Sequence, residues 1–122
     1  MKSRLEAKEQ EQFFNWLSLA YPNFRKLCFA IPNGGSRHPS EAMNLKKQGV
    51  TPGVPDVFCA IQGTLESPGL FVEFKSGKNK LTKLQSEMKD RLEKEGYRYS
   101  LCYNWIEAKN DFLEHVGNRG KR

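Results

Sequence analysis

Two carboxylates and a lysine stand in neighbouring strand-like segments of the sequence. Asp56 opens the apolar run 57–61, and Glu73 and Lys75 lie at the end of the next run, 70–75. Side chains alternate faces along a strand, so Glu73 and Lys75 share one face. If the two runs form a hairpin, the start of the first lies beside the end of the second. We therefore predict that Asp56, Glu73 and Lys75 meet at one end of a sheet.

This arrangement of residue types suits metal-assisted hydrolysis. Two carboxylates at one sheet end repel each other unless a cation lies between them. Their hard oxygen ligands suit Mg²⁺, for which Mn²⁺ can substitute. A divalent ion polarises a phosphate oxygen and activates bound water, and a lysine nearby can orient or deprotonate that water. The three residues thus hold the minimum parts for phosphodiester hydrolysis. The structural alternatives are a salt bridge between Glu73 and Lys75, and a turn role for Asp56.

The first amphipathic segment adds a further carboxylate. Residues 5–20 predict a helix whose apolar arc includes Phe13 and Leu17. Glu6 falls near the centre of this arc, where a carboxylate needs a partner, and a metal site is one. One alternative stays open: the helix frays before Glu6, leaving that side chain in water.

Periodicity and turn residues predict the elements that position these side chains. Besides the helix at 5–20, helices are expected over 39–48, 82–95 and 105–116, and strands over 27–31, 57–61, 70–75 and 97–103. This order predicts an α/β fold, a mixed sheet flanked by helices. The length fits one domain over residues 1–122, in which 117–122 is a frayed basic tail.

Gln85 lies near the start of the helix predicted over 82–95, which Thr82 caps and Gly96 ends. An amide at this position can fix a water molecule or a phosphate, or it can simply be exposed. The expected apolar stripe of this helix consists of Leu81, Leu84, Met88 and Leu92.

A loop and several basic residues form the second candidate surface. Gly34 and Gly35 allow backbone N–H groups to approach a phosphate closely, and basic side chains beside them can contact it. The expected DNA-contacting residues are Asn33, Arg37, His38, Lys46 and Lys78. A net charge of +6 suits a polyanionic partner, although each lysine taken singly is more often a solvated surface charge.

The composition excludes other classes of protein. No apolar run approaches the roughly 18 residues of a membrane span, and the first residues lack the pattern of a signal peptide. A cytoplasmic protein without a membrane partner is expected. Cys28, Cys59 and Cys102 lie in apolar, strand-like runs without metal-ligand spacing, so we expect three buried thiols.

Six motifs follow one another along nearly the whole chain. They are Glu6-x-x-x-Gln10, Asn33-Gly34-Gly35-x-Arg37, Lys46-x-x-Gly49-x-x-Pro52-Gly53-Val54-Pro55-Asp56, Glu73-x-Lys75, Leu81-Thr82-x-x-Gln85 and Gly96-Tyr97. In this order they resemble the VRR-Nuc domains of the PD-(D/E)xK nuclease superfamily, in particular the stand-alone domains of phages and bacteria. The resemblance implies a restriction-endonuclease-like core. It implies that Glu6, Asp56 and Glu73 surround a divalent metal, that Lys75 serves in water activation and that Gln85 supports the site. Glu9 is the alternative to Glu6 as the glutamate that matches the family pattern.

The resemblance also implies an activity. It predicts a Mg²⁺-dependent endonuclease for branched DNA, a Holliday-junction resolvase acting as a homodimer in a bacterial or phage-infected cell. A twofold pair of subunits suits symmetric cutting. Three alternatives stay open: a flap, nicking or duplex-specific nuclease, a non-catalytic nucleic-acid-binding module that keeps the fold, and a structural protein without salt-sensitive DNA affinity. The number of metal ions, one or two, is also open.

Overall fold

A computed structural model describes residues 2–32 and 38–120 of the chain. The elements are α1 (Arg4–Ala20), α2 (Pro22–Arg25), β1 (Cys28–Ala30), α3 (Pro39–Lys47), β2 (Val57–Cys59), the 3₁₀ turn η1 (Thr64–Glu66), β3 (Leu70–Phe74), α4 (Lys83–Lys94), β4 (Arg98–Cys102) and α5 (Trp105–Val116). Every predicted helix and strand is present, the strands being one or two residues shorter than predicted. The short α2 and η1 were not predicted. Among the described residues, no helix is both long and apolar enough to cross a bilayer.

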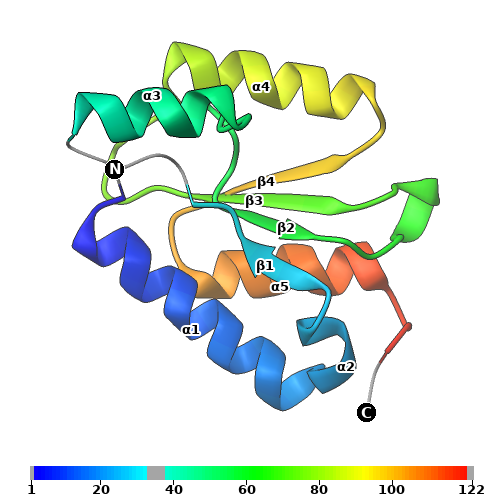
Figure 1. Cartoon of the computed structure of the whole chain (residues 1–122). Coiled ribbons are helices and arrows are strands. Elements are labelled where there is room, and N and C mark those ends of the chain that lie inside the picture. The colour runs from blue at the N-terminus through cyan, green and yellow to red at the C-terminus, as the bar shows by residue number, and fades with distance from the viewer. Residues whose placement is uncertain (1, 33–37, 121–122) are drawn as a thin grey trace.

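The described sheet has the strand order β1-β2-β3-β4. The pairs β1–β2 and β2–β3 are antiparallel, and β4 runs parallel to β3 after the crossover through α4. Val57 pairs with Val72, which confirms the predicted hairpin of β2 and β3. Figure 1 shows α3 and α4 over one face of the sheet and α1 and α5 over the other. The predicted mixed sheet flanked by helices is therefore confirmed.

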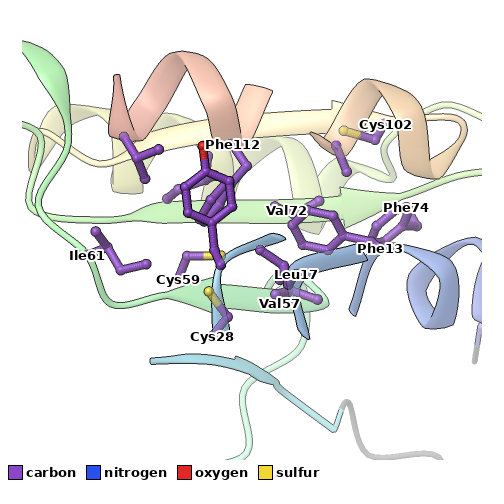
Figure 2. Close-up of a cluster of buried hydrophobic side chains, with 14 residues drawn as sticks. Phe13, Leu17, Cys28, Val57, Cys59, Ile61, Val72, Phe74, Cys102 and Phe112 are labelled. Carbon is purple, nitrogen blue, oxygen red and sulfur yellow. The ribbon is translucent and has the colours of Figure 1, made fainter. Parts of the chain in front are cut away.

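The main core lies between the sheet and the α1–α5 face (Figure 2). Phe13 and Leu17 of α1 pack with Phe112 of α5 against Val72 and Phe74 of β3, and all five are almost fully buried. Burying a side chain of this size contributes about 1.5–3 kcal/mol. The three cysteines are buried free thiols in the same cluster, as predicted. This packing fixes α1 against the strand that carries Glu73.

The opposite face of the sheet is covered more loosely. Neither α3 nor α4 contributes a buried residue, and Leu84, predicted on an apolar stripe, is 53% exposed. Half-buried aromatic rings line this face, and those of Phe58 and Phe71 stack with centroids 4.4 Å apart. Beyond Phe71 on the same face comes Glu73. The loose cover leaves space beside the polar end of β3.

The described part of the predicted basic tail, residues 117–120, is exposed. Arg119 donates a hydrogen bond to the carbonyl oxygen of Gln62, and its guanidinium lies 5.8 Å from the ring centroid of Phe24. These contacts tie the segment after α5 to the loop after β2 and to α2. The frayed basic tail over 117–122 stays a prediction.

Candidate active site

A cleft of about 600 Å³ opens beside the end of β3, bordered by α1, α3, the loop before β2 and the start of α4. Its wall contains the predicted catalytic and metal-binding residues together with one basic residue of the predicted DNA surface. These are Glu6, Asp56, Glu73, Lys75, Gln85 and Lys46. Residues far apart in the sequence therefore share one concave surface.

The hairpin and the preceding loop set the position of Asp56. The pairing of Val57 with Val72 places Asp56 opposite Glu73, and Asp56 Oδ2 accepts a 2.8 Å hydrogen bond from the backbone N–H of Phe74. Gly53 has φ +88°, and a Cβ there would lie 2.7 Å from the carbonyl oxygen of Leu84. The loop therefore packs directly on the backbone of α4. Asp56 is held from both sides, by the strand pair and by this contact.

Glu73 is a buried carboxylate with an unsatisfied oxygen. Its side chain is 4% exposed, and Oε1 has no hydrogen-bond partner among the described residues. Burial raises the pKa of Glu73 to about 8, and the charge of Asp56 adds to this, while Lys75 and Lys2 act in the opposite direction. Desolvation disfavours the charged form of a carboxyl, and a second carboxylate nearby does the same. Such a group holds its charge at neutral pH only if a cation joins it.

Lys75 and Gln85 flank Glu73 on the cleft wall. Lys75 follows β3. Its backbone N–H donates a 2.9 Å hydrogen bond to the carbonyl oxygen of Cys102, which continues the pairing with β4. Gln85 Nε2 donates to Glu73 Oε2 at 3.5 Å, a long hydrogen bond. The same side chain closes the capping box of α4, because its Oε1 accepts a 2.9 Å hydrogen bond from the N–H of Thr82. Gln85 thus joins the start of α4 to the acidic centre.

Glu6 is buried and ordered. It is the third residue of α1, in a capping box with Ser3, so the helix does not fray before it. Its Oε1 accepts from Ser3 N–H at 3.2 Å, and its Oε2 accepts from the N–H and hydroxyl of Ser76 at 3.0 and 3.1 Å. Burial alone would raise the pKa of this carboxyl, but these hydrogen bonds and the charge of Lys75 lower it. The alternative carboxylate, Glu9, accepts a 2.8 Å hydrogen bond from Trp105 N–H and is not part of the cleft wall.

Two carboxylates of the cleft, and not three, are placed to bind one divalent ion. Among residues 2–32 and 38–120, no three acidic, histidine or cysteine side chains are grouped closely enough to hold a metal. The predicted cluster of Glu6, Asp56 and Glu73 is thus not assembled among the described residues, and both oxygens of Glu6 accept hydrogen bonds from Ser3 and Ser76. Asp56 and Glu73 remain, with the unsatisfied Oε1 of Glu73. This donor set fits Mg²⁺, which commonly binds one or two carboxylates and keeps several waters.

The basic residues expected to contact DNA are only partly described. Lys46 is exposed in the last turn of α3, at the cleft, and Lys78 is exposed in the turn after β3. His38 is the exposed N-cap residue of α3. Asn33 and Arg37 lie outside the described residues. Positive side chains therefore border the cleft on the α3 side and follow β3.

Sequence reasoning missed Lys2. Its ammonium group lies 3.1 Å from Asp56 Oδ2, donates to the side-chain oxygen of Gln10 and lies 5.5 Å from the ring centroid of Phe74. The signal was the Ser3-x-x-Glu6 capping box, which starts the helix at Arg4 and leaves the preceding residue beside the cleft.

The fold and the acidic cleft define an α/β domain with a nuclease-type fold. The family model described as the VRR-NUC domain matches residues 1–105, and the chain belongs to this family. A solved structure described as a VRR_NUC domain protein has the same fold, with a TM-score of 0.78 and 24% sequence identity. The alignment covers 95% of this chain and 91% of that one. No curated protein matches the sequence.

Proposed function

We propose that this protein is a Mg²⁺-dependent endonuclease that hydrolyses phosphodiester bonds in branched DNA. The observation that carries the proposal is the pair of opposed carboxylates, Asp56 and Glu73, with Lys75 on the same cleft wall. A buried Glu73 with an oxygen that lacks a hydrogen-bond partner among the described residues is costly in a protein that only binds DNA, because Lys75 and Lys2 offset its desolvation only in part. The VRR-NUC family supports nuclease chemistry.

Each polar residue of the cleft has a distinct task in this proposal. Asp56 and Glu73 would hold the metal ion, which supplies Lewis acidity and lowers the pKa of bound water. Lys75 orients the attacking water and stabilises the negative charge that develops on the phosphate. Gln85 holds Glu73 in place through its amide. Water adds to phosphorus, the bond from phosphorus to the leaving oxygen breaks, and that oxygen takes up a proton.

The lysines around the cleft supply affinity for DNA that does not depend on the base sequence. Lys46 lies at the cleft and Lys78 lies three residues beyond Lys75, so both suit contacts to phosphates on either side of the scissile bond. Binding through such contacts falls steeply with salt concentration. In a DNA junction, two sugar-phosphate backbones converge, and such a substrate would contact Lys46 and Lys78 at the same time.

We further propose that the protein cuts four-way junctions as a homodimer. One cleft cuts one strand, so symmetric incision of two strands needs two copies related by a twofold axis. The edge strand β1 of the described sheet offers apolar surface for such contact, because Phe29 is 49% exposed there. Light scattering of the purified protein tests this assembly, and a monomer at working concentration would contradict it.

A cleavage panel tests the activity itself. Purified protein is incubated with a four-way junction, a flap, a nicked duplex and an intact duplex, each with Mg²⁺, with Mn²⁺ and with EDTA. We expect cleavage of the junction in either metal and none in EDTA. The variants Asp56→Ala and Lys75→Ala should bind the junction and leave it intact. Preferred cutting of another substrate would revise the specificity. Salt-sensitive binding without any cleavage would establish a non-catalytic module instead.

A further inference from the structure

A lysine outside the predicted catalytic set forms an ion pair with one of the two opposed carboxylates. Lys2 Nζ lies 3.1 Å from Asp56 Oδ2 and donates to Gln10 Oε1, and the Lys2 side chain is 21% exposed. The ring of Phe74, 5.5 Å from the ammonium group, forms an apolar wall on another side. Surface ion pairs between long side chains contribute little, but this one is largely withdrawn from water and held by three different groups.

The position of this ammonium group relieves the electrostatic conflict in the cleft. Asp56 and Glu73 face each other across the hairpin, and the charge of Asp56 adds to the rise in the pKa of Glu73. The charge of Lys2 acts on Glu73 as well as on Asp56, since it opposes the rise in the pKa of Glu73. Lys2 therefore supplies part of the positive charge that a divalent ion would bring to the two carboxylates. Its ammonium group carries a single charge and can only donate hydrogen bonds.

Lys2 lies before the first helix and not within it. It precedes the N-cap residue Ser3, so the helical hydrogen bonds that fix α1 begin after it. By contrast, Lys75 directly follows β3, and its backbone is hydrogen-bonded to Cys102. The two lysines of the cleft thus differ, because the backbone of Lys75 is hydrogen-bonded to the sheet, whereas Lys2 precedes the first helix.

We propose that Lys2 is a built-in counter-ion that competes with the divalent ion for Asp56. Without metal, its ammonium group neutralises Asp56 and keeps the hairpin end intact. When a divalent ion binds, the ammonium group leaves Asp56, because two cations next to the same carboxylate oxygen repel each other. Lys2 is a positioning residue and not a metal ligand. The inference rests on the proposed function, since it requires that Asp56 take part in the metal site.

The experiment compares the full chain, tagged at its C-terminus, with Lys2→Gln and Lys2→Arg at fixed ionic strength. Lys2→Gln removes the charge and keeps much of the length, whereas Lys2→Arg keeps the charge. Lys8→Ala is the matched control, because Lys8 is an exposed residue of α1 outside the cleft wall. Titration calorimetry with Mn²⁺ alone measures the dissociation constant, and thermal unfolding is followed with EDTA and with saturating Mn²⁺.

We expect Lys2→Gln to bind Mn²⁺ about tenfold more tightly than the wild type, and Lys2→Arg and Lys8→Ala to bind it with nearly wild-type affinity. In EDTA, the melting temperature of Lys2→Gln should fall below that of Lys8→Ala, and saturating Mn²⁺ should remove the difference. An unchanged dissociation constant in Lys2→Gln, or a loss of stability that Mn²⁺ does not restore, overturns the role of Lys2. Either of these two results leaves the nuclease proposal intact if the wild type binds Mn²⁺ and cleaves the junction. Absence of Mn²⁺ binding in every variant overturns both the metal site and this inference.

Discussion

The carboxyl group of Asp56 lies opposite Glu73 across the antiparallel β2–β3 pair, and its Oδ2 accepts a hydrogen bond from the residue after Glu73. Backbone pairing and the loop before β2 thus hold the two acidic groups opposite one another. Backbone pairing restricts how far the two carboxylates can separate to escape repulsion. The two carboxylates therefore remain close together in the metal-free protein. Several measurable properties of the protein follow from this proximity.

The first prediction concerns the pH dependence of stability in the metal-free protein. The pKa of Glu73 is about 8 in the folded state against an ordinary value of 4.5. The folded protein therefore binds the proton more tightly than the unfolded chain does. The stability gained from protonated Glu73 is fully present below pH 4.5 and is lost as the pH rises to 8. We expect the free energy of unfolding to fall over this range by an amount on the order of 5 kcal/mol.

Urea unfolding in EDTA, followed by tryptophan fluorescence, measures this fall. Glu73→Gln keeps the shape of the side chain and cannot titrate, so its advantage over the wild type should grow from pH 5 to pH 8 and then level off. The difference between the two proteins removes the contribution of other titrating groups. A difference that stays constant with pH would show that Glu73 is ionised throughout this range.

The second prediction concerns His115, a buried residue of α5 far from the acidic pair in sequence. Its Nε2 lies 2.7 Å from the carbonyl oxygen of Ile61, and its Nδ1 is buried without a partner among the described residues. Burial lowers the pKa of His115 below 6.5. The neutral ring donates from Nε2, and a second proton on Nδ1 would find no acceptor. Stability from this residue is therefore complete above pH 6.5 and declines as the pH falls below it.

His115→Leu should lose this dependence and should also be less stable than the wild type at pH 7.5, by about 1–3 kcal/mol, because the Ile61 carbonyl loses its donor. Unfolding experiments at pH 5.0, 6.0 and 7.5 compare the two proteins. Equal slopes with pH in both would contradict the assignment of a neutral buried ring.

The sequence predicts the opposed carboxylates because their placement depends on local rules. Two short apolar runs joined by a turn-rich segment form a hairpin, and the twofold alternation of side chains then decides which residues share a face. Asp56, Glu73 and Lys75 all follow from this reasoning. The family motif and the register thus agree at the residues where backbone pairing sets the geometry.

The partners of Glu6 do not follow from the sequence in the same way. The helical periodicity correctly predicts that Glu6 faces inward, but Ser76 reaches it only because α1 packs beside the turn after β3. Such a contact depends on the packing of distant elements, which no local pattern encodes. The prediction that Leu84 lies on a buried stripe is wrong for a related reason. An amphipathic pattern shows which residues can be buried, but α4 covers the sheet loosely and Leu84 stays exposed.

The third prediction tests how the loop before β2 holds Asp56. At Gly53, an added Cβ would meet a strained φ of +88° and also approach the Leu84 carbonyl oxygen to 2.7 Å. At Gly49, the φ is +101°, but nothing lies within 4 Å of the added atom. Gly53→Ala should therefore destabilise the protein by about 1–3 kcal/mol more than Gly49→Ala does, because only Gly53 touches α4.

Denaturant unfolding of both variants provides the comparison, and Mn²⁺ titration shows whether the clash moves Asp56. We expect weaker Mn²⁺ binding in Gly53→Ala only. If the two alanine variants lose the same stability and bind Mn²⁺ alike, the contact of the loop with α4 does not position the carboxylate.

The last prediction separates the two tasks of Gln85. Its Oε1 closes the capping box of α4, and its Nε2 donates to Glu73. In Gln85→Glu the carboxylate oxygen can still accept from Thr82 N–H, as glutamate does in capping boxes, but the donor to Glu73 is lost and a negative charge takes its place. We therefore expect a helix that stays capped beside an acidic pair that is more strained.

Gln85→Glu should melt close to the wild type in the presence of Mg²⁺ and cleave a junction at least tenfold more slowly. Gln85→Ala should lose both the cap, which costs about 0.5–2 kcal/mol, and the support of Glu73. Circular dichroism melting and single-turnover cleavage measure the two effects on the same samples. Wild-type cleavage by Gln85→Glu would show that the 3.5 Å contact with Glu73 is incidental and that Gln85 serves only the start of α4.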